Sequence, residues 1–156
     1  MQNKGLLEYP IKTNIQPNYY NPLRSILDET PTQSVTFISD SCVKVSCIFD
    51  GEVCLIEEID SMYVVMTKFG SYYLTYTNLT KPVIKKGDFI KKGQIIANLD
   101  KDFDDRFSVD IYLNYGEKTI DAYSWFRKKI ISKNSVIKQT ENNELYSFIE
   151  ILNNRL

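Results

Sequence analysis

The chain has 156 residues, which predicts one domain with short extensions. Hydrophobic residues make up 43% of it and charged residues 25%, so disorder throughout the chain is excluded. The net charge of −1 gives no electrostatic basis for binding nucleic acid. The chain contains no histidine, which excludes catalysis by Ser–His or Cys–His pairs and every zinc site that uses imidazole. Composition therefore argues against an enzyme.

Residues 1–34 form the first region, which holds four of the five prolines and many Asn, Gln and Thr residues. We expect an extended lead-in with little regular structure of its own. Its start lacks the apolar run of a secretory signal, and no run of 18 apolar residues predicts a membrane span. We therefore do not expect an integral membrane protein.

Residues 35–126 favour β-strands. Val43, Val45 and Cys47 alternate with polar residues, which is typical of a half-buried strand. Asp50-Gly51 predicts a hairpin turn before EVCLIEEI, and Gly70-Ser71 predicts another between MYVVMTKF and SYYLTYTNL. QIIANL and FSVDIYL predict two further strands. The expected fold class is mainly β, a sandwich or barrel of short strands joined by tight turns.

A local repeat, IKKGDF followed by IKKGQI, occupies residues 84–95. Each glycine is expected to turn the chain at positive φ, with Ile84, Ile90 and Ile95 pointing into the core and the lysines in solvent.

The last 30 residues, 127–156, predict a helical tail. Asp121 can cap a short helix over AYSWFRKKII, and a second helix is expected over residues 145–152, where apolar residues follow helical spacing.

Two smaller motifs leave alternatives open. Cys42, Cys47 and Cys54 match no zinc spacing and are interpreted as small buried side chains. The run DKDFDD at residues 100–105 starts like a calcium loop but lacks that loop's Gly and Glu, so a solvated acidic loop is the preferred interpretation.

The strand region resembles the LytM-type, lysostaphin-like zinc endopeptidases of bacterial cell walls. The resemblance rests on SCVKVSCIFDGEV, YYLTYTNL followed by VIKKGDFIKKGQIIANL, and then FSVDIYL and SWF, in that order. It implies a two-sheet β-sandwich of the duplicated-hybrid type with short C-terminal helices.

The resemblance also implies that the chemistry has been lost. The family's metal-binding H-x3-D pair would fall near Val35 and Ser39, and the histidine of its Y-x-H-L motif falls on Asn78. The histidines of its H-x-H motif fall on Arg106 and Ser108. Because valine cannot ligate zinc, serine ligates poorly and arginine adds a fixed positive charge, we expect no metal, no cofactor and no catalytic residue.

A binding role is the function that the resemblance implies. Noncatalytic LytM-like domains act in the bacterial envelope as activators of peptidoglycan amidases or as scaffolds, so a cell-envelope protein, or peptidoglycan itself, is the expected partner. The periplasm or cell envelope is the implied location, with the cytoplasm left open. The groove residues that we expect to contact a partner are Tyr73, Asn78, Arg106 and Ser108. Two alternatives remain: a metal-dependent wall hydrolase that uses carboxylates such as Asp110, and a structural domain whose groove is plugged.

Overall fold

The computed structural model describes residues 7–19 and 34–126. Ten strands occur in these ranges, followed by a short 3-10 helix, η2, at Ala122–Trp125. The strands are β1 Asn18–Tyr19, β2 Val35–Ser39, β3 Lys44–Ser46, β4 Gly51–Ile59, β5 Met62–Phe69, β6 Tyr72–Leu79, β7 Phe89–Ile90, β8 Ile95–Asn98, β9 Phe107–Tyr115 and β10 Lys118–Ile120. The expectation of a mainly β fold is therefore confirmed.

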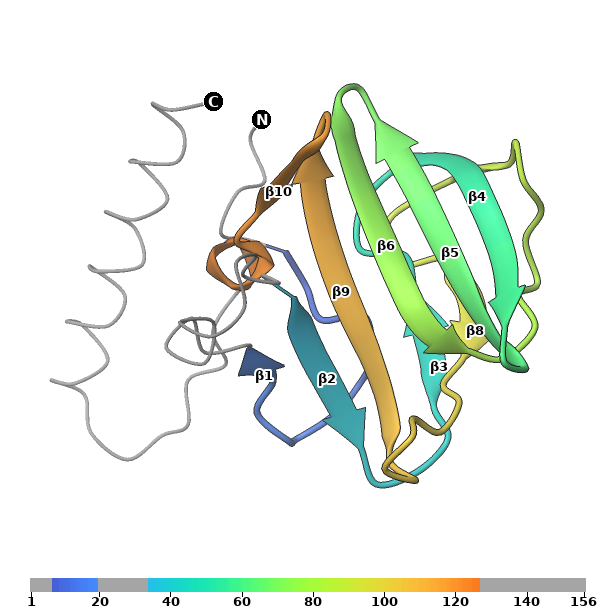
Figure 1. Ribbon diagram of the computed structural model, residues 1–156, viewed down its shortest axis with the longest axis vertical. Coiled ribbons are helices and arrows are strands. Elements are labelled where there is room, and N and C mark those ends of the chain that lie inside the picture. The colour runs from blue at the N-terminus through green and yellow to red at the C-terminus, as the bar shows by residue number, and fades with distance from the viewer. Residues whose placement is uncertain (1–6, 20–33, 127–156) are drawn as a thin grey trace, which may run out of the picture. The chain divides into compact units, whose positions relative to one another are not determined.

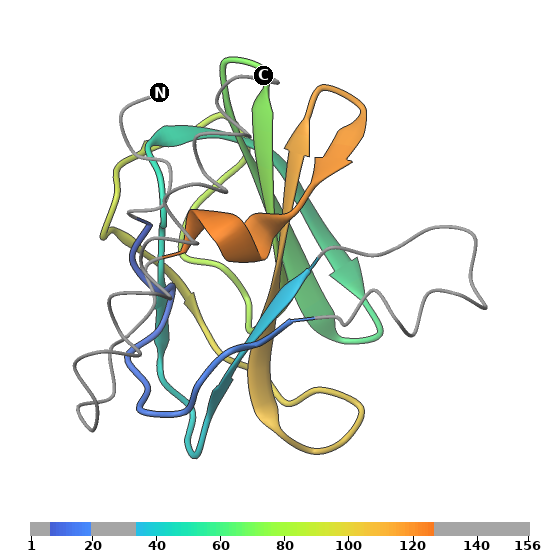
Figure 2. The ribbon, with the colours of Figure 1, turned by 90° about the vertical axis from the view of Figure 1, so that its left-hand side faces the viewer.

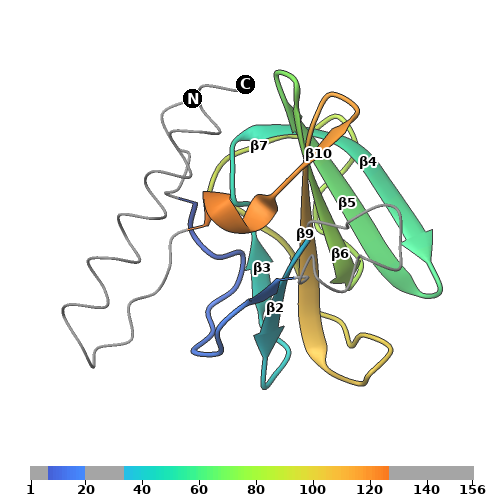
Figure 3. The same ribbon diagram turned by 60° about the vertical axis from the view of Figure 1, so that its left-hand side comes forward.

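Eight strands form one antiparallel sheet, ordered β1-β2-β9-β6-β5-β4-β7, with β10 paired to β9 (Figure 1). The other two strands, β3 and β8, form a separate two-stranded sheet. Figures 2 and 3 show that β3 lies to one side of the large sheet rather than at its edge. The large sheet thus has one face toward the small sheet and one face away from it.

The core follows from the alternation of side chains along the central strands. On β9, Val109 and Ile111 are fully buried, whereas Asp110 between them is only half-buried. Successive side chains of a strand point to opposite faces, so Asp110 lies on the other face of the sheet. Tyr76 of β6 is also fully buried, and its hydroxyl accepts a hydrogen bond from the backbone N–H of Ile48 at 3.0 Å.

The first predicted hairpin turn was wrong. β3 pairs with β8 in the small sheet, so Asp50-Gly51 connects two sheets and does not join paired strands. A Cβ at Gly51 would lie 2.8 Å from the carbonyl oxygen of Lys68 on the neighbouring strand, so this glycine permits close backbone approach. The β4–β5 hairpin instead turns at Asp60 and Ser61, both at positive φ.

The second predicted hairpin and most of the repeat are confirmed. β5 and β6 pair across Gly70, which has a φ of 59°. Gly87 and Gly93 in the repeat also have positive φ, and Ile84 and Ile90 are buried. Ile95 was wrongly placed in the core: it is 37% exposed, and its neighbour Ile96 is fully buried instead.

The cysteine interpretation holds for one residue of the three. Cys47 is buried, Cys54 is half-buried and Cys42 is exposed. Burial raises the pKa of the Cys47 thiol despite opposing hydrogen bonds with Phe49 and Tyr76. Cys42 is thus the thiol most open to solvent among the three.

The chain divides into two compact units, Tyr9–Tyr123 and a second unit made of residues 1–8 and 124–156. In the second unit, the N–H of Leu7 donates to the carbonyl oxygen of Trp125 at 3.1 Å, and Leu7 forms a parallel bridge with Phe126. The helix expected over 145–152, and most of the one expected after Asp121, lie outside the described residues. No helix in the described ranges is long and apolar enough to cross a membrane.

Candidate functional site

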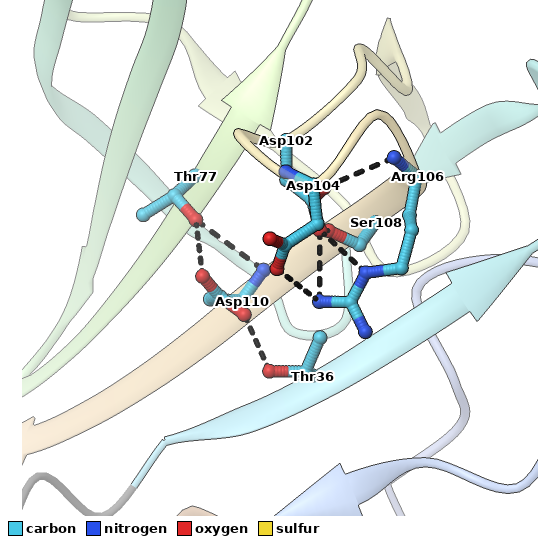
Figure 4. Close-up of polar contacts among 7 residues, drawn as sticks. All are labelled: Thr36, Thr77, Asp102, Asp104, Arg106, Ser108 and Asp110. Carbon is cyan, nitrogen blue, oxygen red and sulfur yellow. Dashed lines mark hydrogen bonds and ion pairs between the residues drawn. The ribbon is translucent and has the colours of Figure 1, made fainter.

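A row of polar side chains crosses three central strands on the face of the large sheet away from its core. Thr36 of β2 is the register partner of Asp110 on β9, and Thr77 of β6 lies on the other side of Asp110 (Figure 4). The hydroxyl of Thr36 donates to one carboxylate oxygen of Asp110 at 2.5 Å, and that of Thr77 lies 3.4 Å from the other. The N–H of Asp110 in turn donates to the Thr77 hydroxyl at 3.3 Å. Both oxygens of this carboxylate are therefore engaged by neutral hydroxyl groups.

A second carboxylate, that of Asp102, folds back onto the start of β9. Its Oδ2 accepts hydrogen bonds from Ser108 Oγ at 2.8 Å and Arg106 Nε at 3.2 Å, and it lies 3.0 Å from Arg106 Nη2 (Figure 4). Its Oδ1 accepts from the backbone N–H groups of Asp104 at 2.9 Å and Arg106 at 3.0 Å. We call the set of Asp102, Arg106 and Ser108 the Asp102 cluster.

The Asp102 cluster is asymmetric in its exposure to solvent. The side chain of Asp102 is 12% exposed, whereas that of Arg106 is 46% exposed and also lies 3.5 Å from the exposed carboxylate of Asp104. Burial alone would raise the pKa of Asp102, but the hydrogen bonds from Arg106 and Ser108 outweigh it and lower that pKa. Asp102 is therefore an anion at neutral pH, bound to a cation that still faces solvent.

The structure brings three of the four expected groove residues to one end of the sheet. Arg106 and Ser108 meet through Asp102, and the carbonyl oxygen of Asn78 accepts a hydrogen bond from the N–H of Asp100, in the same loop, at 2.8 Å. Asn78 has a φ of 56°, a left-handed conformation that asparagine tolerates better than most residues.

Tyr73, the fourth expected groove residue, lies elsewhere on the sheet. It pairs with Asn114, six residues along β9 from Ser108, which corresponds to about 20 Å at the rise of an antiparallel strand. Its ring instead lies 5.6 Å from Nζ of Lys68. Tyr73 therefore shares the face of the Asp102 cluster but not its immediate surroundings.

The two positions expected near the family's metal pair do not join the polar row. Val35 and Ser39 are both buried on the core-facing side of β2, while Thr36 between them lies on the face of Asp110. The alternation in VTFIS indicates this arrangement, because the apolar Val35 and Phe37 must face the core and Thr36 must then face the other way. Sequence reasoning missed Thr36 and Thr77 altogether.

The acidic run at 100–105 is only partly a solvated loop. Asp104 and Asp105 have side chains 79% and 81% exposed, as expected, but Asp102 turns inward. In the described ranges no group of three His, Cys, Asp or Glu residues is placed to hold a metal ion. The neighbours of the two inward carboxylates are hydroxyl and guanidinium groups, and such groups do not complete the three strong protein ligands of a zinc site. The residues at this place do not fit zinc.

Comparisons with known proteins bear on the fold. No protein-family model matches the chain, and no curated protein matches it. Among solved structures, Helicobacter pylori Csd3 matches with a TM-score of 0.64 at 19% identity, over 98% of this chain and 44% of Csd3. A zinc-containing peptidase from Vibrio cholerae matches with a TM-score of 0.58 at 19% identity, over 76% of this chain and 40% of the peptidase. A chain of the SpoIIIAH–SpoIIQ complex matches with a TM-score of 0.55 at 16% identity, over 78% of this chain and 92% of its own length.

These matches define the class of fold: a β-rich domain shared by peptidases and by a component of a protein complex. More particularly, it is the LytM-like fold that the sequence motifs predicted, and that prediction is confirmed. The chain spans less than half the length of Csd3 and of the Vibrio cholerae peptidase.

Proposed function

We propose that this domain is a noncatalytic LytM-like module that binds a component of the bacterial cell envelope and does not hydrolyse it. The expected ligands are an envelope protein, such as a peptidoglycan amidase that the domain activates or scaffolds, or peptidoglycan itself. Among the structural matches, SpoIIQ is described in complex with SpoIIIAH, which supports a role in protein binding for this fold.

The Asp102 cluster is the observation that carries the proposal. At the place that the resemblance gives to the H-x-H motif, Arg106 and Ser108 hold a carboxylate of the chain itself. A guanidinium fixed at this position would repel a metal cation. The complete absence of histidine removes the ligands that this class of zinc site requires.

Arg106 is the residue best placed to contact a ligand. Its side chain is 46% exposed, and its contacts with Asp102 and Asp104 use Nε and Nη2, along one edge of the planar guanidinium. A planar guanidinium can bind a carboxylate through two parallel hydrogen bonds, so a carboxylate of a stem peptide or of a partner protein suits this position. Asn78 would flank that contact, whereas Ser108, only 1% exposed, would act indirectly by holding Asp102.

Binding to purified sacculi tests this proposal. We expect the domain to cosediment with sacculi or with its envelope partner, and R106Q to weaken that binding about tenfold or more. K101Q is the matched control because it removes a cation from the same loop, where Lys101 pairs only with the exposed Asp105 among the described carboxylates. Equal binding by wild type, R106Q and K101Q would show that Arg106 does not contact the ligand.

A further inference from the structure

A pocket of about 500 Å3 lies apart from the polar row and the Asp102 cluster. It is formed between the segment at residues 9–12 and the small sheet, and no residue of β2, β6 or β9 lines it. Its volume falls within the range of about 300–1,000 Å3 that is common for ligand pockets. The lining residues are Tyr9, Pro10, Ile11, Lys12, Cys42, Val43, Lys44, Ser46, Ile95 and Asn98.

The segment that forms one wall of the pocket is held in place by hydrogen bonds. The carbonyl oxygen of Pro10 accepts from the N–H of Ser46 on β3 at 2.7 Å. The hydroxyl of Thr13 donates to the carbonyl oxygen of Ile38 at 2.7 Å, and Ile11 is 4% exposed. The pocket is therefore built by the fold and does not need a ligand to form it.

The two charged residues that line the pocket are both lysines. Lys12 and Lys44 are exposed, one on each wall, and no acidic residue is among the lining residues. Neither lysine forms an ion pair with a carboxylate of residues 7–19 or 34–126. Two cations on opposite walls favour a ligand with a negative charge.

Most of the other lining residues are apolar. Pro10, Ile11 and Val43 contribute aliphatic surface, and Ile95 is 37% exposed although it is a large hydrophobic residue. The pocket thus combines apolar surface with two positive charges.

We propose that this pocket is a second binding site, distinct from the Asp102 cluster, and that it takes an extended acidic peptide segment in which a carboxylate adjoins an aliphatic side chain. The aliphatic side chain lies against Val43 and Ile95, and the carboxylates of the peptide pair with Lys12 and Lys44. The site does not depend on the function proposed for Arg106, because none of its residues belongs to the Asp102 cluster.

The test uses a defined probe, a fluorescent pentapeptide with alternating leucine and glutamate, and a second version in which glutamine replaces glutamate. We expect the glutamate peptide to bind saturably in fluorescence anisotropy and the glutamine version to bind about tenfold more weakly. K12E and K44E should each weaken binding of the glutamate peptide. The control is K118E, which reverses an exposed lysine on β10 outside the pocket and should bind as wild type does.

Cys42 gives an independent readout because it lines the pocket and is exposed. In a C54S background, the glutamate peptide should slow the reaction of Cys42 with a maleimide, and the glutamine version should not. Equal binding of the two peptides, unchanged binding by K12E and K44E, or unprotected Cys42 at saturation would each overturn the proposal. K44E should bind sacculi as wild type does. Failure of the pocket proposal can therefore be distinguished from failure of the proposed envelope-binding function.

Discussion

Replacement of Asp102 by alanine should destabilise the domain far more than replacement of an acidic neighbour in the same loop. The change leaves Ser108 Oγ without its acceptor, and Ser108 is only 1% exposed, so water cannot readily replace the lost partner. An unsatisfied buried hydroxyl costs about 1–3 kcal/mol. The ion pair with the half-exposed Arg106 adds about 0–1 kcal/mol, because solvent screens it.

The backbone contacts of the loop add little to the loss. Asp102 Oδ1 accepts from two backbone N–H groups, those of Asp104 and Arg106, which are exposed enough to bond to water instead. We therefore expect D102A to lower the free energy of unfolding by about 1–4 kcal/mol in total.

Urea denaturation followed by tryptophan fluorescence or circular dichroism measures this difference. D104A is the matched control, since the Asp104 side chain is 79% exposed and its ion pair with Arg106 spans 3.5 Å. It should change the free energy of unfolding by less than about 0.5 kcal/mol. If D102A proves as stable as D104A, the Asp102 cluster does not hold this loop and the reasoning is refuted.

Three further predictions concern the core and the pH dependence. Y76F should cost about 1–3 kcal/mol in urea denaturation because it leaves the buried N–H of Ile48 without an acceptor; a neutral result would contradict the importance of that bond. G51A should cost about 1–3 kcal/mol in the same assay because its methyl group would meet the Lys68 carbonyl oxygen at 2.8 Å, and an unchanged midpoint would show that the strands can separate. The pKa of Asp102 is lowered in the folded state, so its stabilising effect should be complete above the ordinary pKa of 3.8 and lost as pH falls through the lowered value. The difference between wild type and D102N in urea denaturation from pH 7 to 2 should shrink accordingly; a constant difference would show that ionisation is not its source.

Local patterns in the sequence were sufficient to predict most strands. Alternation and turn residues placed the β5–β6 hairpin at Gly70 and the two turns at Gly87 and Gly93. They failed at Asp50-Gly51, where the same dipeptide that closes hairpins connects two different sheets. Strand pairing is a long-range property: β3 pairs with β8, which lies about 50 residues further along the chain.

The candidate site could be predicted only in part, for a similar reason. The resemblance identified Arg106 and Ser108, but the partner that joins them is Asp102, in a run whose composition favours solvent. Thr36 and Thr77 are 41 residues apart in the chain, and only the register of β9, which lies between their strands, brings both to Asp110.

Zinc binding combined with wall digestion tests the central claim most directly. The purified domain is dialysed against zinc, its metal content is measured, and it is then incubated with labelled sacculi. The account predicts less than one zinc ion per ten molecules and no release of soluble fragments, while the domain still sediments with the sacculi or with its partner. One zinc ion per molecule together with zinc-dependent release of fragments would contradict it.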